Sequence, residues 1–145
     1  MNENKPRIFY VCAILEKDNK ILLLKRTNTG WMDGNWCIPG GSVEENETFL
    51  ETAIREMKEE LDLTFAPDQL SIAHILEMHT KDSKRIGVYF SSNEWQGEAK
   101  NNEPHEHGEM AWFSIDALPE NMIQSGKHVI EQYKKNKNIS IIIQE

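Results

Sequence analysis

The sequence predicts an α+β fold in which helices pack against a mixed β-sheet. Two observations lead to this class. Strand-like segments open the chain with a hairpin, and a regular amphipathic helix, further strands and a second helix follow in that order. A doubly wound parallel sheet would instead alternate strands and helices throughout. The length of 145 residues fits one domain, which we place at residues 1–145.

The beginning of the chain is rich in β-branched and aromatic residues. Arg7–Glu16 and Lys20–Arg26 are predicted to be strands, and Asp18-Asn19 between them is a turn signal, so the two segments form a hairpin. The next segment, Thr27–Asn35, is rich in Gly, Asn and Asp and is predicted to be a loop.

The most regular pattern in the chain follows this loop. A short strand is expected at Trp36–Ile38, leading into the turn Pro39-Gly40-Gly41. Apolar residues then recur with the helical period through Thr48–Leu61. Thr48 and the glutamate three residues later form a candidate capping box, and Asn46 is a rival cap.

The second half predicts more strands and one more helix. The expected strands are Leu70–Met78, Arg85–Ser91, Glu109–Ser114 and Ile139–Ile143. A polar loop is expected at Gln96–Gly108 and a helix at Asn121–Asn136. The terminal strand contains four isoleucines and can pair with a sheet edge of the same chain or of a partner, so a homodimer remains open.

Composition excludes several classes of function. The formal net charge is −8, from 24 acidic residues against 16 Lys and Arg, whereas binding to a nucleic-acid backbone needs clustered bases. An anionic small substrate would therefore need an intervening cation. Two cysteines are too few for a disulfide framework. No signal-like or membrane-spanning apolar run is present, so we expect a cytoplasmic protein without a membrane partner.

Three glutamates share one face of the first helix. On a helical wheel Glu56, Glu59 and Glu60 cover an arc of roughly 100° beside the apolar face. Like charges at this spacing repel, and a hard cation with oxygen ligands would offset the repulsion. A solvated acidic face is the alternative. The neighbouring Arg55 and the preceding Pro39-Gly40-Gly41 loop favour the metal site.

The same residues belong to a longer pattern. The segment from Gly41 to Leu63, GSVEENETFLETAIREMKEELDL, resembles the Nudix box G-x(5)-E-x(7)-R-E-U-x-E-E-x-G-U, where U is aliphatic. Eight of the nine fixed positions match over these 23 residues. The departure is Asp62, where the family has Gly. Because Asp enters the left-handed region at lower cost than most residues, we interpret Asp62 as a strained helix cap and not as a lost catalytic group.

The resemblance implies the Nudix fold, an α-β-α sandwich, and hydrolysis of a nucleoside diphosphate linked to another moiety. It assigns Glu56, Glu59 and Glu60 as ligands of Mg²⁺ or Mn²⁺, helped by the Gly40 carbonyl. It also implies that Arg55 orients Glu56. Glu56 is the first candidate for the base that takes the proton from water.

Further roles follow from the family. Glu47 is expected to brace the junction between loop and helix. Gly40 and Gly41 allow backbone to approach the ligand without a Cβ. Arg26 resembles the Arg that many MutT-type members place on the substrate phosphates, an exposed strand-end Arg being the alternative.

Many members draw an additional carboxylate from a distant loop. In this chain Glu103, Glu106 and Glu109 lie in or beside such a loop, and Glu106 and Glu109 are ranked above Glu103. A solvated loop acid is the alternative for each. His105 and His107 in the same loop lack a zinc spacing, so we expect them to be solvated.

The base of the nucleotide is less clearly specified. Trp31 is the best candidate for stacking on it, whereas Trp112 is expected in the core. Cys37 stands where oxidised-guanine hydrolases have Asn, and its plainer interpretation is a buried small apolar residue.

The preferred function is a nucleoside triphosphate pyrophosphohydrolase that releases the monophosphate and pyrophosphate from a small nucleotide. The alternatives are a Nudix hydrolase of a nucleotide sugar or capped RNA end, and a non-catalytic nucleotide-binding module. The acidic net charge disfavours long RNA.

Overall fold

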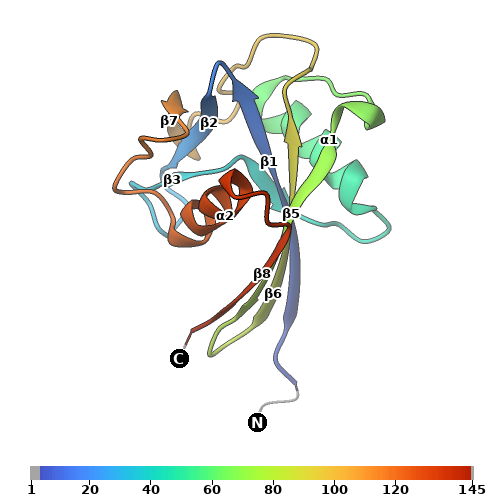
Figure 1. The fold of residues 1–145 in the computed structure, drawn as a ribbon, viewed down its shortest axis with the longest axis vertical. Helices are drawn as coiled ribbons and strands as arrows, with labels where there is room; N and C mark the ends of the chain where they lie inside the picture. The colour runs from blue at the N-terminus through green and yellow to red at the C-terminus, as the bar shows by residue number, and fades with distance from the viewer. Residues whose placement is uncertain (1–3, 145) are drawn as a thin grey trace.

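The computed structural model describes residues 4–144, which form a mixed β-sheet between two α-helices (Figure 1). The strand order is β3-β2-β1-β6-β5-β8, with β4 paired to β1 and β7 paired to β2. The strands are β1 (Arg7–Lys17), β2 (Lys20–Arg26), β3 (Trp36–Cys37), β4 (Gly40–Ser42), β5 (Ser71–His79), β6 (Lys84–Ser92), β7 (His107–Ser114) and β8 (Ile139–Ile143). The helices are α1 (Phe49–Leu61) and α2 (Gln124–Lys134), with a 3₁₀ turn at Pro67–Gln69. The predicted class is confirmed.

The opening hairpin is confirmed, and it ends in the turn that the sequence predicts. Asp18 and Asn19 both have positive φ, 51° and 62°, as a two-residue hairpin turn requires. Beyond the turn the two strands diverge. β1 then runs parallel to β6, from Arg7↔Lys84 to Leu15↔Ser92, and this pairing makes the sheet mixed.

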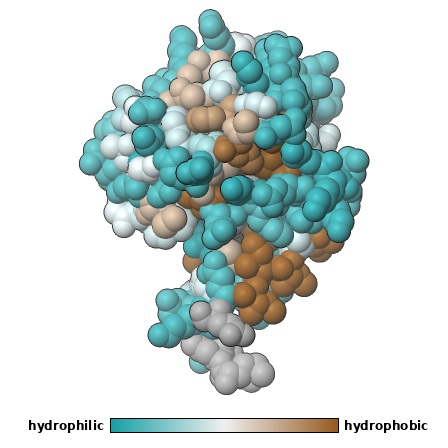
Figure 2. All heavy atoms as spheres, turned by 60° about the vertical axis from the view of Figure 1, so that its left-hand side comes forward, coloured by the Kyte–Doolittle hydropathy of each residue, from teal (hydrophilic) through white to brown (hydrophobic). Residues whose placement is uncertain are grey.

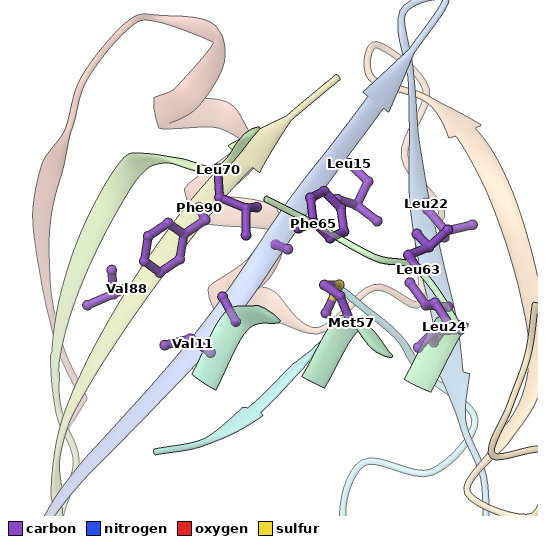
Figure 3. Close-up of a cluster of buried hydrophobic side chains, with 13 residues drawn as sticks. Val11, Leu15, Leu22, Leu24, Met57, Leu63, Phe65, Leu70, Val88 and Phe90 are labelled. Carbon is purple, nitrogen blue, oxygen red and sulfur yellow. The ribbon is translucent and has the colours of Figure 1, made fainter. Parts of the chain in front are cut away.

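The core between α1 and the sheet explains why α1 lies where it does. Met57 and Leu61 are fully buried and pack against Val11 and Leu15 of β1 and other residues of one cluster (Figure 3). The helix begins after Thr48, which forms the predicted capping box. The rival Asn46 is not the cap. The apolar stripe therefore sets which face of α1 the sheet covers, and the glutamate arc follows from it.

Asp62 ends α1 in the left-handed conformation, with φ 56° and ψ 35°. This confirms its interpretation as a helix cap. Its carboxylate lies 2.9 Å from Nζ of Lys58 and 3.8 Å from Nζ of Lys100. These contacts are exposed, so each adds little stability.

Replacing Asp62 with glycine is expected to leave turnover intact and not to lower the melting temperature. Glycine relieves the left-handed strain, and this gain offsets the loss of an exposed ion pair. Thermal unfolding and steady-state kinetics of the variant test this expectation. A large loss of activity would show that Asp62 does more than cap the helix.

α2 covers the opposite face of the sheet and is shorter than predicted. Val129 and Ile130 are fully buried with Ile14, Tyr89 and other residues of a second cluster. The prediction that this helix begins at Asn121 is wrong, because that backbone is bonded elsewhere. The amide of Trp36 donates to the Asn121 carbonyl at 2.9 Å, and the Ile123 amide donates to the Trp36 carbonyl at 2.8 Å.

Two further boundaries differ from the prediction. Gly40–Ser42 is not only part of a turn, because it forms β4 and pairs antiparallel with Tyr10–Cys12 of β1. β7 begins at His107, within the segment predicted to be loop, because a shift of register between Lys25 and Arg26 extends the pairing. Both differences bear directly on the site.

β8 pairs parallel with β5 and is the last strand of the sheet in the part of the chain described. Ile139, Ile141 and Ile143 are 67%, 59% and 71% exposed. Figure 2 shows an apolar patch at the end of the molecule where β8 runs in Figure 1. Within residues 4–144, neither helix is long or apolar enough to cross a membrane.

Candidate active site

One cavity, of about 480 Å³, brings together residues from α1, β4, the end of β2 and the loop before β7. It is lined by Arg26, Asn28, Thr29, Gly40, Gly41, Glu56, Glu59, Glu60, Glu103, Glu106 and His107. Five of these residues are glutamates, and one carries a guanidinium. A phosphate-bearing ligand would meet strong repulsion here unless cations accompanied it.

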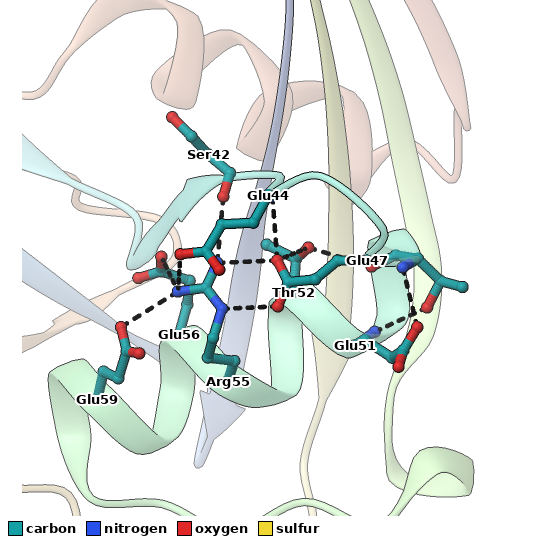
Figure 4. Close-up of polar contacts among 9 residues, drawn as sticks. Ser42, Glu44, Glu47, Glu51, Thr52, Arg55, Glu56 and Glu59 are labelled. Atoms are coloured by element: carbon teal, nitrogen blue, oxygen red, sulfur yellow. Dashed lines mark hydrogen bonds and ion pairs between the residues drawn. The ribbon is translucent and has the colours of Figure 1, made fainter.

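Arg55 lies beside the cavity and joins the loop to the helix (Figure 4). Its Nε donates to Glu47 Oε2 at 2.7 Å, and Nη1 donates to Glu56 Oε1 at 3.0 Å and to Glu59 Oε2 at 3.2 Å. Nη2 reaches the Ser42 carbonyl at 3.2 Å. One guanidinium therefore fixes the orientation of two candidate metal ligands and ties them to β4.

Glu47 has the bracing position that the family resemblance implies. It accepts from Arg55 and from Oγ1 of Thr52 at 2.8 Å, and these bonds tie the loop to the first two turns of α1. The Arg55 hydrogen bond is the main cause that lowers the pKa of Glu47 to about 2. The carboxylate is thus strongly favoured in its charged form.

Replacing Glu47 with glutamine is expected to flatten the acid limb of the stability profile. A carboxyl whose folded pKa is depressed stabilises the fold above its unfolded value of 4.5, and this contribution is lost as the pH falls toward about 2. Chemical denaturation between pH 2 and 7 would measure the difference. An acid limb identical in the two proteins would contradict this role.

Gly41 lies against the carboxylate of Glu56. A Cβ at position 41 would clash with Glu56 Oε1, so the carboxylate that Arg55 holds would have to shift. Glu56 is half-buried, and burial raises its pKa above the ordinary value although Arg55 opposes the rise. A carboxylate with a raised pKa, held by a fixed donor, suits the role of proton acceptor.

Glu60 is the deepest of the three helix carboxylates, with 3% of its surface exposed. Its Oε1 accepts from the Gly40 amide at 2.9 Å. Burial, and after it the charge of Glu56, raises the pKa of Glu60 well above its ordinary value. Such a carboxylate gains most from a bound cation, so the donor set fits a divalent metal.

Of the two loop glutamates ranked first by sequence, only Glu106 lies in the cavity, and Glu103 lies there in place of Glu109. Glu103 and Glu106 both line the cavity, but Glu109 lies on β7, is exposed, and has Lys25 Nζ at 3.7 Å. Glu103, Glu60 and His107 place one ligand atom each within 4.8 Å of one another. Glu103, ranked last, is thus closer to the helix cluster than Glu109.

The expectation that His107 is solvated is wrong. It is 7% exposed, and its Nε2 lies 3.5 Å from Glu60 Oε2. Burial lowers the pKa of His107, which favours the neutral ring. Sequence alone did not indicate this position, since the register shift beside Arg26 carries the residue inward. His105 is exposed, as expected.

Arg26 reaches the cavity and organises the loop that follows it. Its Nη2 donates to Thr29 Oγ1 at 2.9 Å, and its Nε donates to the Trp31 carbonyl at 2.8 Å. The guanidinium also lies 4.9 Å from the centre of the Trp31 ring, which is 54% exposed. A flat exposed ring beside a guanidinium is suited to bind a base and its phosphates.

Comparison with known proteins identifies the family. The profile described as NUDIX domain matches residues 5–133. The chain belongs to the Nudix family. It is 35% identical over 130 residues to the ADP-ribose pyrophosphatase of Methanocaldococcus jannaschii, a match that covers 88% of this chain and 73% of the relative.

Two other Nudix proteins are similar to this chain, one in sequence and one in structure. The CTP pyrophosphohydrolase of Escherichia coli is 27% identical, with 79% of this chain and 78% of the relative covered. The crystal structure of the MutT NUDIX hydrolase from Burkholderia pseudomallei has the same fold, with a TM-score of 0.80 at 24% identity, covering 88% of this chain and 98% of that one. The chain is therefore a Nudix hydrolase of the MutT-like type.

Trp112 and Cys37 lie outside the Nudix box, and the structure agrees with the prediction for only one of them. Trp112 is not a core residue, because it is 36% exposed and stacks on Trp95 with ring centres 6.2 Å apart. Cys37 packs against the cluster beneath α1, and burial raises its pKa to about 12. Its interpretation as a small packed residue agrees with the structure.

A second, polar hollow of about 570 Å³ lies at the β1–β2 turn and the end of β6. It is lined by residues that include Glu16, Asp18, Asp68, Glu94 and Tyr133. No residue of the Nudix box lines it. The cavity beside α1 therefore remains the candidate active site.

Replacing Arg26 with glutamine is expected to raise KM about tenfold with a smaller change in kcat. The substitution releases the loop that holds Trp31 and, if Arg26 contacts the substrate phosphates as the family resemblance implies, removes that charge-assisted contact. Steady-state kinetics with any accepted nucleotide would measure both constants. An unchanged KM would show that Arg26 contacts only its own loop.

Proposed function

We propose that this Nudix hydrolase splits nucleoside triphosphates into the monophosphate and pyrophosphate, using Mg²⁺ or Mn²⁺. The observation that carries the proposal is the cavity itself, in which five carboxylates from two segments face a space with one guanidinium. Its volume of about 480 Å³ lies in the usual range for a site that takes a small ligand. The E. coli relative is named for the hydrolysis of CTP, a nucleotide of this class.

Three carboxylates of α1 would hold the metal. Glu56, Glu59 and Glu60 are presented on one face, and the Gly40 carbonyl is the further ligand that the family resemblance implies. Glu106 and Glu103 line the opposite side of the cavity and are candidates for an additional ligand. A bound divalent metal neutralises phosphate oxygens and lowers the pKa of water.

Side chains in and beside the cavity accept the proton, orient the proton acceptor and bind the substrate. Glu56 accepts the proton of the attacking water, and Arg55 keeps its carboxylate in position through the 3.0 Å hydrogen bond. Arg26 binds the phosphates, and Trp31 offers its exposed face to the base. Water then adds to one phosphorus, the bridging P–O bond breaks, and the products leave as monophosphate and pyrophosphate.

A nucleoside diphosphate sugar is the second candidate substrate. The M. jannaschii relative, 35% identical, is named an ADP-ribose pyrophosphatase. The same carboxylates and Arg26 would serve this substrate, because the diphosphate is common to both classes. Trp31 is exposed, so its ring leaves room beside it for the sugar that is linked to the diphosphate.

A panel of nucleotides with and without Mg²⁺ tests the proposal. We expect release of monophosphate and pyrophosphate from at least one nucleoside triphosphate, dependent on metal and abolished by a chelator. Glu59→Gln should lose this turnover while remaining folded. Monophosphate and a sugar phosphate from ADP-ribose alone would instead establish the second candidate. No metal-dependent turnover on the whole panel would indicate a nucleotide-binding module.

A further inference from the structure

A nitrogen donor lies against the carboxylates of the candidate metal site. Glu60, Glu103 and His107 each offer one ligand atom, and the three atoms lie within 4.8 Å of one another. Metal–ligand bonds to imidazole and carboxylate are about 2.0–2.2 Å long, so three ligands spread evenly around one ion are at most about 3.8 Å apart. Closing each separation by up to about 1 Å would let all three atoms bind one ion.

The ring of His107 has unused hydrogen-bonding capacity. Among residues 4–144, its Nδ1 and Oδ1 of Asn101 are the buried side-chain atoms that have no hydrogen-bond partner. The 3.5 Å separation between Nε2 and Glu60 Oε2 is longer than a normal hydrogen bond. Leaving Nδ1 of a buried imidazole unsatisfied is costly, and the long contact of Nε2 leaves that nitrogen available to a stronger partner.

The backbone around this ring is held in place by hydrogen bonds within the chain. The amides of Glu106 and His107 both donate to the Glu103 carbonyl, at 3.0 and 2.9 Å. The Asn102 amide donates to the Glu60 carbonyl at 2.9 Å, which fastens the loop to the last turn of α1. Asn101 Nδ2 donates to the His107 carbonyl at 2.7 Å. The loop thus presents Glu103 and His107 to Glu60 as a fixed set.

We propose that His107 is a metal ligand at this site, together with Glu60 and Glu103, and biases it toward first-row transition metals over Mg²⁺. Imidazole suits these metals, whereas Mg²⁺ favours oxygen ligands and an octahedral shell of waters and carboxylates. The proposal rests on the proposed function insofar as that function places a metal at Glu60. The proposal adds a metal ligand from outside the Nudix box, His107, and a preference for certain metals that follows from it.

Calorimetric titration tests the selectivity. The metal-free full chain is titrated with MgCl₂ and, separately, with CoCl₂, without nucleotide. We expect Co²⁺ to bind at least about tenfold more tightly than Mg²⁺. His107→Gln should weaken Co²⁺ binding about tenfold or more and change Mg²⁺ binding less than about threefold. His105→Gln, two residues away and exposed, is the matched control and should leave both affinities unchanged. Equal loss of both metals in His107→Gln would overturn the selectivity.

Pulsed electron paramagnetic resonance of Mn²⁺ bound to the unaltered protein tests the ligand without any substitution. We expect a ¹⁴N coupling of the size of a directly bound imidazole, which is retained in His105→Gln. Its absence from the unaltered protein would overturn the proposal. These measurements use no substrate, so their failure would leave Mg²⁺-dependent hydrolysis standing. Conversely, if no nucleotide of the panel is hydrolysed but the ¹⁴N coupling is present, only the proposed function is overturned.

Discussion

Replacing Glu60 with glutamine is expected to lower kcat by roughly two to three orders of magnitude while the protein remains folded. Glu60 is the most buried carboxylate of the site and is held by the Gly40 amide, so its charge faces the cavity with little solvent screening. Glutamine keeps the shape of the side chain but removes the charge that would bind a cation. Steady-state kinetics with an accepted nucleotide and saturating metal would measure the loss.

Glu45→Gln is the matched control for this substitution. Glu45 lies in the same Nudix box at a variable position, and its side chain is exposed. The control variant should retain the unaltered rate. A Glu60→Gln protein with normal turnover would contradict the assignment of Glu60 as a metal ligand.

The same substitution has a second expected effect, on stability in the absence of metal. The folded pKa of Glu60 is raised well above the ordinary 4.5, so its ionisation at neutral pH opposes folding. Stability from this group is fully present below the unfolded pKa and is lost as the pH rises through the folded pKa. We therefore expect Glu60→Gln to raise the melting temperature of the metal-free protein at neutral pH. Divalent metal should stabilise the unaltered protein and not this variant.

Replacing Arg55 with glutamine is expected to lower kcat/KM about a hundredfold and the melting temperature by at least about 3 °C. Arg55 lies within 3.6 Å of four glutamates, and its removal leaves their charges without a partner. The paired residues are Glu44, Glu47, Glu56 and Glu59. Glu56 would then lose the donor that orients it, and the loop that contains Glu47 would be released from α1.

Arg55→Lys separates charge from geometry. Lysine keeps the positive charge but lacks the fork that contacts Glu47 and Glu56 together. We expect it to recover part of the melting temperature and little of the activity. Arg7→Gln removes an exposed arginine at the start of β1, outside the cavity, and serves as the control. Full activity in Arg55→Lys would show that position 55 contributes charge alone.

The sequence predicted much of α1 and of the site that it carries. The helical period, the Thr48 capping box and the left-handed Asp62 are all confirmed. Arg55 contacts Glu56 as the family resemblance implied. These features depend on residues within one or two helical turns of each other, so their spacing in the chain sets their spacing in the structure.

The loop before β7 was predicted less well. Glu109 was ranked high but pairs with Lys25, and His107 was expected in solvent but is buried against Glu60. The start of β7 depends on a shift of register between β2 and β7, which no local pattern displays. A shift of one residue on a strand reverses the side to which a side chain points.

By itself the sequence determined the acidic arc of α1 and the guanidinium beside it, because these arise from helical periodicity and short-range spacing. The tertiary structure alone decided that Glu60 is buried while its neighbour Glu59 remains exposed, and that Glu103 and His107 meet Glu60. The packing of α1 on β1 sets how deep each helix position lies. The long-range pairing of β2 with β7 sets which loop residues reach it, and both are contacts between segments far apart in the chain.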